Sequence, residues 1–130
     1  MDNPILYIIR GASGSGKTTL ATVLSDNAVA ADDFMVDASG RYFFDPRSLP
    51  IVHQKCELAV RRYMERGVST IAVHNTFTQR WQWKPYLNLA AEHGYAVHVL
   101  ECQNDYGNLH DCPTATVRDQ RRVMERPDYS

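Results

Sequence analysis

Residues 11–18 read GASGSGKT and follow the apolar run ILYII at residues 5–9. The spacing G-x-x-x-x-G-K-T, between a strand-like run and a helical pattern at residues 19–24, is that of a phosphate-binding loop, or P-loop. Its glycines allow backbone conformations in which N–H groups converge on a phosphate. The start of the following helix adds unpaired donors and a favourable dipole. The stretch therefore predicts binding of a nucleotide di- or triphosphate.

The side chains of this loop carry its expected chemistry. Lys17 is expected to reach the β- and γ-phosphates, and the hydroxyl of Thr18 is expected to bind Mg²⁺. The predicted nucleotide-binding residues are Gly11, Ser13, Gly14, Ser15, Gly16, Lys17, Thr18 and Thr19.

The composition of the 130-residue chain fits one domain, residues 1–130, and sets limits on its partners. Fourteen Lys and Arg against 15 Asp and Glu give a net charge of −1, so any nucleic-acid contact would need a local basic patch. Three widely spaced cysteines without a C-x-x-C pair argue against a disulfide scaffold or a zinc site. No apolar run approaches membrane-spanning length, and we expect a cytoplasmic protein without a membrane partner.

Strand and helix patterns alternate along the chain. The predicted strands lie at residues 5–10, 28–31, 69–74 and 95–101. The predicted helices are residues 17–26, 49–66, a third that a capping box at 76–79 begins, and a last one opened by Pro113. A small hairpin is expected around the turn at residues 37–40. This order predicts an α/β protein, a three-layer αβα sandwich of the P-loop NTPase type with a short parallel sheet of about four strands and a C-terminal lid or helix.

Two acids, Asp32 and Asp33, directly follow the second predicted strand. Ligands of open α/β sheets sit at the carboxyl ends of the strands. An aspartate there can accept a proton from an attacking hydroxyl or hold Mg²⁺ through water. The alternative is a solvated acidic turn. We favour function, and Asp32 over Asp33, because Asp32 leaves the strand first.

The third predicted strand ends in His74, Asn75 and Thr76, again on the ligand side. Asn75 could hydrogen-bond a substrate, or Asn75 and Thr76 could simply cap the next helix. His74 is the weaker candidate, because histidines at strand ends are often only packed or solvated.

Aromatic residues and arginines form two further groups. Stacking on a base is one use of the aromatics Trp81, Trp83 and Tyr86, but core packing is more frequent. The last predicted helix carries Arg118, Arg121, Arg122 and Arg126. An arginine over the γ-phosphoryl group would stabilise the transition state of phosphoryl transfer, although a basic helical face is usually only solvated surface.

The ordered set of motifs resembles that of small P-loop kinases related to the phage-type polynucleotide 5′-hydroxyl kinases, in the group that includes zeta-toxin-like kinases. The residues that carry it are GASGSGKT, Asp32-Asp33-Phe34, Gly40-Arg41-Tyr42, Phe44-Asp45-Pro46, His53, Asn75-Thr76, Trp81-x-Trp83-Lys84-Pro85-Tyr86, Gly94-Tyr95 and Asn108-x-His110-x-x-Pro113. The resemblance implies ATP and Mg²⁺ at Lys17 and Thr18, Asp32 as general base, and Asn75 in the acceptor site. It also implies a lid at about residues 104–122.

The chain departs from this family pattern at three positions. His74 stands where the family commonly has Asp, Phe77 where it has Asn, and Gly107 where it has a lid arginine. The first two changes affect the acceptor side. The third removes the usual transition-state arginine, so either Arg118, Arg121 or Arg122 substitutes for it or the enzyme is slow or inactive.

Three functions remain open from the sequence. The first is an ATP-dependent kinase acting on a nucleic-acid hydroxyl, either a 5′-OH end or a hydroxylated base, with catalytic residues Lys17, Asp32, Arg118 and Arg122 and substrate residues Asp33, Asn75 and Thr76. The second is a kinase of a small metabolite, nucleoside or sugar, which the near-neutral charge favours. The third is a nucleotide-binding regulatory protein with little transferase activity, suggested by Gly107.

Overall fold

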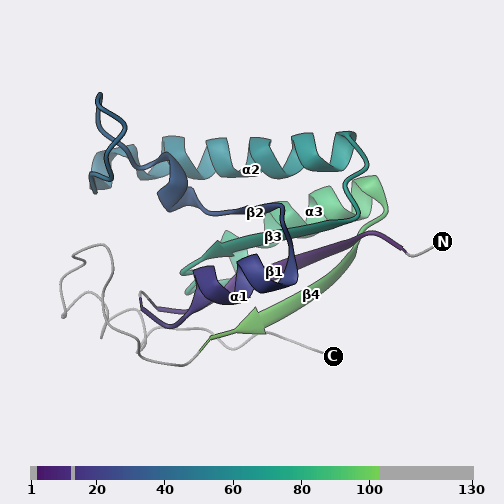
Figure 1. Ribbon diagram of the computed structural model, residues 1–130. Helices are drawn as coiled ribbons and strands as arrows, with labels where there is room; N and C mark the ends of the chain where they lie inside the picture. The colour runs from purple at the N-terminus through teal and green to yellow at the C-terminus, as the bar shows by residue number, and fades with distance from the viewer. Residues whose placement is uncertain (1–2, 13, 103–130) are drawn as a thin grey trace.

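The computed structural model describes residues 3–12 and 14–102. Its four strands form one sheet in the order β2-β3-β1-β4, and all neighbouring strands are parallel. The strands are β1 (Ile5–Arg10), β2 (Ala28–Val29), β3 (Thr70–Asn75) and β4 (Ala96–Glu101). Parallel pairing brings every carboxyl end to the same edge of the sheet, at the left of Figure 1. The P-loop stretch, which joins β1 to α1, lies at this edge.

Helices cover both faces of the sheet, which confirms the predicted three-layer α/β architecture. The helices are α1 (Lys17–Leu24), α2 (Leu49–Glu65) and α3 (Lys84–His93). One face packs against α1, and the other packs against α2 and α3 (Figure 1). Within residues 3–12 and 14–102, no helix combines the length and the apolar character that crossing a membrane requires.

The alternation of side chains along β1 and β3 decides which face each strand end serves. Ile8 and Val73 belong to the core under α2 and α3, whereas Ile9 and Ala72 belong to the core under α1. Successive strand residues point to opposite faces of a sheet. His74, which pairs with Ile9, therefore continues the α1 side.

Two turns differ in detail from the sequence prediction. The second strand is shorter than predicted, because Ala31 already begins a 3₁₀ turn, η1 (Ala31–Phe34). The predicted hairpin is present as a single antiparallel bridge between Val36 and Tyr42, followed by a second 3₁₀ turn, η2 (Pro46–Ser48). Residues 31–48 thus form a compact connection between β2 and α2.

The predicted start of the third helix is wrong. Residues 76–79 are not helical; a 3₁₀ turn, η3 (Arg80–Gln82), follows them, and α3 begins at Lys84. The side chain of Arg10 donates to the carbonyl oxygens of Phe77 (3.0 Å) and Thr78 (3.2 Å), so these groups serve a tertiary contact. Phe77 also has a φ of 49°, in the left-handed region that a helix cannot use. The capping-box pattern was overridden by these contacts.

Candidate active site

The P-loop backbone is held between two neighbouring segments at its first residue. The N–H of Gly11 donates to the carbonyl oxygen of Thr76 (3.2 Å), and the N–H of Cys102 donates to the carbonyl oxygen of Arg10 (2.8 Å). A Cβ atom built on Gly11 would meet Ser15 Oγ and would lie 2.7 Å from the carbonyl oxygen of Cys102. Only glycine fits this crossing, which explains the first glycine of the motif.

The loop ends at the amino terminus of α1 in a conformation suited to phosphate. Gly14 (φ 78°) and Gly16 (φ 96°) are left-handed, and Gly16 is the residue before the helix. The ammonium group of Lys17 donates to the carbonyl oxygens of Gly11 (2.8 Å) and Ala12 (2.9 Å), so it lies folded over the loop. The N–H groups of a first helical turn have no intrahelical acceptor and favour an anion.

The remaining P-loop side chains fit a nucleotide with its metal ion. Ser15 is buried, and its hydroxyl has no hydrogen-bond partner within the part of the chain that the structure describes. Thr18 and Thr19 are exposed in the first turn of α1. A hydroxyl oxygen is a hard ligand of the kind that Mg²⁺ prefers, so Thr18 stays the predicted ligand of the ion. Ser13 lies outside the described residues.

The two acids lie on η1, beside the carboxyl end of β3. Asp33 Oδ2 accepts the N–H of Ala30 (2.9 Å) and so closes the 3₁₀ turn. Asp32 is exposed, while its backbone carbonyl accepts the N–H of Met35 (3.0 Å). Asp33 is thus partly used by the local fold, and Asp32 presents its carboxylate to the solvent at the site.

Asn75 connects β3 to the acidic turn. Its Oδ1 accepts the N–H of Ala31 (2.7 Å), and its Nδ2 lies 3.8 Å from the sulfur of Cys56 on α2. The side chain is buried on the α2 side, so the amide holds the first residue of η1 and does not cap α3, the helix that follows β3. Burial raises the pKa of the neighbouring Cys56 thiol to about 11, which keeps this thiol protonated and unreactive.

His74 is placed closer to the phosphate side than the sequence indicated. It is buried on the α1 side of β3, and burial lowers the pKa of its ring. The carboxylate of Asp33 raises this pKa, the ammonium of Lys17 lowers it, and the carboxylate of Asp32 raises it. The ring therefore lies within electrostatic reach of both the P-loop lysine and the two acids.

His53 on α2 is a second histidine near the acids. Burial lowers its pKa, and the carboxylates of Glu57 and Asp32 oppose this shift. Asp32 thus lies within electrostatic reach of two histidines, the buried His74 on the sheet and the half-buried His53 on α2.

The sequence analysis did not identify Arg10 as a residue of this region's contact network. Its side chain is fully buried at the carboxyl end of β1, although the residue directly precedes the P-loop. Besides its two carbonyl contacts, the guanidinium lies 3.9 Å from Glu101 Oε1 and 4.7 Å from the centre of the Trp83 ring. An arginine that closes an otherwise apolar strand was the available signal, because such a charge needs buried partners.

The other predicted residues are placed as follows. Thr76 is half-buried and contributes its backbone carbonyl to the P-loop contact. Trp83 and Tyr86 are buried in the core, as expected, whereas Trp81 is 70% exposed. The predicted lid and Arg118, Arg121, Arg122 and Arg126 lie outside the described residues.

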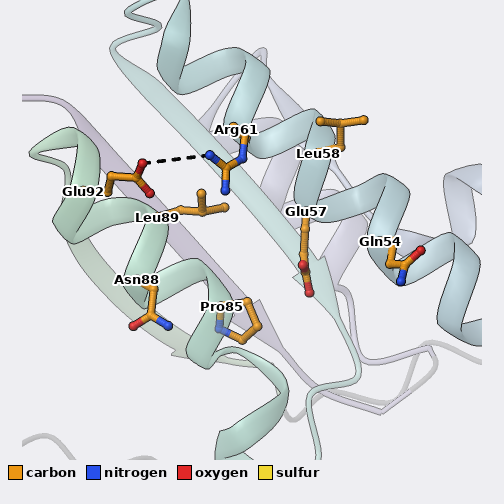
Figure 2. A pocket seen from close by; sticks show the side chains of 8 residues that line it. All are labelled: Gln54, Glu57, Leu58, Arg61, Pro85, Asn88, Leu89 and Glu92. Carbon is orange, nitrogen blue, oxygen red and sulfur yellow. Dashed lines mark ion pairs between the residues drawn. The ribbon is translucent and has the colours of Figure 1, made fainter.

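A separate groove of about 350 Å³ lies between α2 and α3 (Figure 2). Arg61 of α2 pairs with Glu92 of α3 across it, at 3.9 Å. Leu58, Pro85 and Leu89 supply its apolar walls. Among residues 3–12 and 14–102, no predicted site residue lines this groove, so it is distinct from the described site at the strand ends.

Comparison with known proteins agrees with this geometry. Residues 6–127 match the family described as an AAA domain. NEDD4-binding protein 2 of Homo sapiens is 33% identical over 102 residues, covering 75% of this chain but only 6% of that protein.

Three solved structures show the same fold at low sequence identity. They are a putative kinase from Chloroflexus aurantiacus J-10-fl (TM-score 0.61, 18% identity, 78% of this chain and 60% of that chain), a chain of the Pnkp1/Rnl/Hen1 RNA repair complex (0.60, 19%, 100% and 41%) and a gluconokinase from Sinorhizobium meliloti 1021 (0.56, 12%, 99% and 79%). With its P-loop, parallel sheet and flanking helices, the chain belongs to this AAA domain family and has the fold of a P-loop kinase-like domain.

Proposed function

We propose that the chain is an ATP-dependent kinase that transfers the γ-phosphate to a hydroxyl of a nucleic acid, at a 5′-OH end or on a hydroxylated base. The observation that carries this proposal is that the P-loop and η1 are both bound to the carboxyl end of β3. The N–H of Gly11 donates to the carbonyl oxygen of Thr76 (3.2 Å), and the N–H of Ala31, the residue before Asp32, donates to Asn75 Oδ1 (2.7 Å). A phosphate-binding group and a proton acceptor thus share one edge of the sheet, as phosphoryl transfer to a hydroxyl requires.

In this proposal each described residue has one task. The P-loop N–H groups and the Lys17 ammonium bind the β- and γ-phosphates of ATP, and the Thr18 hydroxyl holds Mg²⁺. The carboxylate of Asp32 accepts the proton of the acceptor hydroxyl as its oxygen bonds to the γ-phosphorus. The bond from that phosphorus to the bridging oxygen breaks, and ADP leaves. Arg118 and Arg122, on the proposed lid, would neutralise charge on the transferred group.

Asp33, Asn75 and Thr76 complete the proposed acceptor side. Asn75 acts by fixing Ala31, and therefore Asp32, through its 2.7 Å hydrogen bond. A nucleic-acid acceptor is supported by the motif set that resembles polynucleotide kinases and by the fold shared with a chain of an RNA repair complex.

A small hydroxylated metabolite is the second candidate acceptor. The net charge of −1 and the two carboxylates of η1 favour an acceptor without many phosphates. The fold is also shared with a gluconokinase. A regulatory, weakly active protein is the third candidate, because Gly107 replaces the expected lid arginine.

The decisive experiment is transfer of labelled γ-phosphate from ATP to a panel of acceptors. The panel holds 5′-OH DNA and RNA strands, oligonucleotides with a hydroxylated base, nucleosides and sugars, with Lys17→Ala as the control for nucleotide binding. The proposal expects label on at least one oligonucleotide. Label only on a nucleoside or sugar supports the second candidate, and ATP binding without acceptor-dependent turnover supports the third.

A further inference from the structure

Exposed apolar side chains gather in the connection between η1 and α2 and in the first turn of α2. This hairpin patch consists of Val36 (49% exposed), Phe43 (56%), Phe44 (48%), Leu49 (36%) and Ile51 (55%). Nine large hydrophobic residues are exposed in the described part of the chain, and five of them lie within residues 36–51. An exposed apolar cluster is a candidate binding surface, whereas scattered exposed apolar residues are normal.

The hairpin patch is fixed to the acidic turn by backbone contacts. The buried Met35 donates its N–H to the carbonyl of Asp32 (3.0 Å) and accepts the N–H of Phe43 (3.0 Å). The N–H of Asp45 lies 3.5 Å from the sulfur of Met35. In Figure 1 the segment projects at the upper left, past the start of α2, at the end of the molecule that also holds the P-loop. The patch therefore continues outward from Asp32.

We propose that the hairpin patch is a stacking platform for the nucleotides next to the acceptor hydroxyl of a single-stranded nucleic acid. The inference rests on the proposed function and specifies its substrate. Phe43 and Phe44 offer aromatic faces, and base stacking on aromatic rings tolerates any sequence. Arg41 is exposed on the same hairpin and supplies a cation for a phosphate of the strand.

The charges on the hairpin favour stacking over a phosphate track. Asp37 Oδ1 accepts the N–H and hydroxyl of Ser39 (2.9 and 2.6 Å) and the N–H of Arg41 (3.1 Å), and Asp45 pairs with Arg47 at 3.1 Å. These carboxylates shape the turn, and they cancel much of its positive charge. A duplex held by its backbone would need a stronger basic surface than this. A small metabolite that reaches Asp32 would leave the rings uncovered.

The test compares acceptors of increasing length. With 5′-OH strands of one, two, four and eight nucleotides, KM of the wild type should fall with length and then level off. The double variant Phe43→Leu, Phe44→Leu keeps apolar side chains but removes both rings. It should raise KM for the longer strands about 10-fold, leave kcat and the mononucleoside KM unchanged, and so lose the length dependence. Arg41→Gln should reduce, by about 0.7, the steepness with which the logarithm of the strand-binding constant falls with the logarithm of the salt concentration.

Leu58→Ala on α2 is the matched control, because Leu58 is exposed and apolar but lines the groove between α2 and α3. Its KM should equal that of the wild type at every length. The inference would be overturned if KM depended on strand length equally in the double variant and the wild type. It would also be overturned if Leu58→Ala raised KM for the longer strands as much as the double variant does. If no strand is phosphorylated, the proposed function fails, and fluorescence anisotropy with a labelled eight-nucleotide strand still decides the platform. Full retention of strand binding by the double variant would refute the stacking platform. That result would favour a protein partner for the hairpin patch.

Discussion

The buried ring of His74 lies on the α1 side of β3, within electrostatic reach of Lys17, Asp32 and Asp33. The sequence ranked this residue low, because a histidine at a strand end is often only packed. The alternation of side chains along β3 changes this interpretation, since Ala72, two residues earlier, packs under α1. His74 therefore lies on the α1 side of the sheet, and Asn75 lies on the opposite side.

The lowered pKa of His74 predicts a pH-dependent stability. The unfolded chain binds a proton on this ring as the pH falls through about 6.5, and the folded chain does so only at lower pH. Stability that is present above pH 6.5 is therefore lost below it. The Tm should decrease as the pH is lowered from about 7.5 to about 5.5. This decrease should be smaller in His74→Asn than in the wild type. His53, whose pKa is also lowered, supplies another part of the decrease, so it should be smaller still in the double variant His53→Asn, His74→Asn. An unchanged pH profile of the Tm in His74→Asn would refute the assignment.

Phe77 combines a left-handed backbone with buried aromatic packing. Its φ is 49°, and its ring meets those of Trp83 and Tyr86 edge-on, with centroids 6.1 and 5.7 Å apart. A left-handed backbone at a non-glycine residue costs about 1–3 kcal/mol. Packing of the ring therefore holds an unfavourable conformation in place.

Two substitutions separate these contributions. Phe77→Ala and Phe77→Gly both remove the ring and should both destabilise the protein, by about 3 kcal/mol or more for Ala. Only glycine relieves the backbone, so Phe77→Gly should be the more stable variant by about 1 kcal/mol. Urea unfolding of the two variants measures the difference. An alanine variant as stable as the glycine variant would show that the backbone is not strained.

At the scale of elements, the site depends on the contact between β3 and η1. Asn75 at the end of β3 accepts the N–H of Ala31 at the start of η1, and Asp32 is the next residue. The same strand begins with another asparagine contact, in which Asn27 donates to the carbonyl of Thr70 at 3.1 Å. One asparagine thus supports the site, and the other supports only the amino end of β3.

Asn75→Ala should leave the buried N–H of Ala31 without its acceptor, which costs about 1–3 kcal/mol of stability. Because Asp32 loses its support, kcat should fall about 10-fold or more while the affinity for ATP stays unchanged. Asn27→Ala is the control, which should lower stability without changing kcat. Calorimetry with ATP and steady-state transfer assays separate the two effects. Equal kinetics in the two variants would mean that Asn75 is only structural.

At the scale of the whole molecule, Arg10 joins the sheet to the loop that leads into α3. The two residues whose carbonyls it binds are 67 and 68 positions away in the chain. Arg10→Met should therefore lower the free energy of unfolding by about 3 kcal/mol, because two carbonyls and Glu101 lose a buried partner. Chemical unfolding measures this loss. Arg47→Met, which breaks the exposed pair with Asp45, should leave the unfolding midpoint unchanged.

Sequence patterns predicted the elements whose bounds depend on residues close together in the chain. The apolar run before Gly11 gave β1 with its observed bounds, and α2 begins at the predicted Leu49. The start of α3 could not be predicted, since Arg10 binds the carbonyls of the capping-box segment across the sheet. The placement of His74 and Asn75 on opposite sides also depends on strand register, which no single segment encodes.

The most direct test of one shared phosphotransfer site is a single-turnover measurement on Asp32→Asn. Asp32 lies on η1, outside the P-loop, so the variant should bind ATP with wild-type affinity in calorimetry. Its rate of γ-phosphate transfer to the best acceptor should fall about 10²–10⁴-fold, because the hydroxyl loses its proton acceptor. Transfer at the wild-type rate would contradict the account, and so would a loss of ATP binding equal to that of Lys17→Ala.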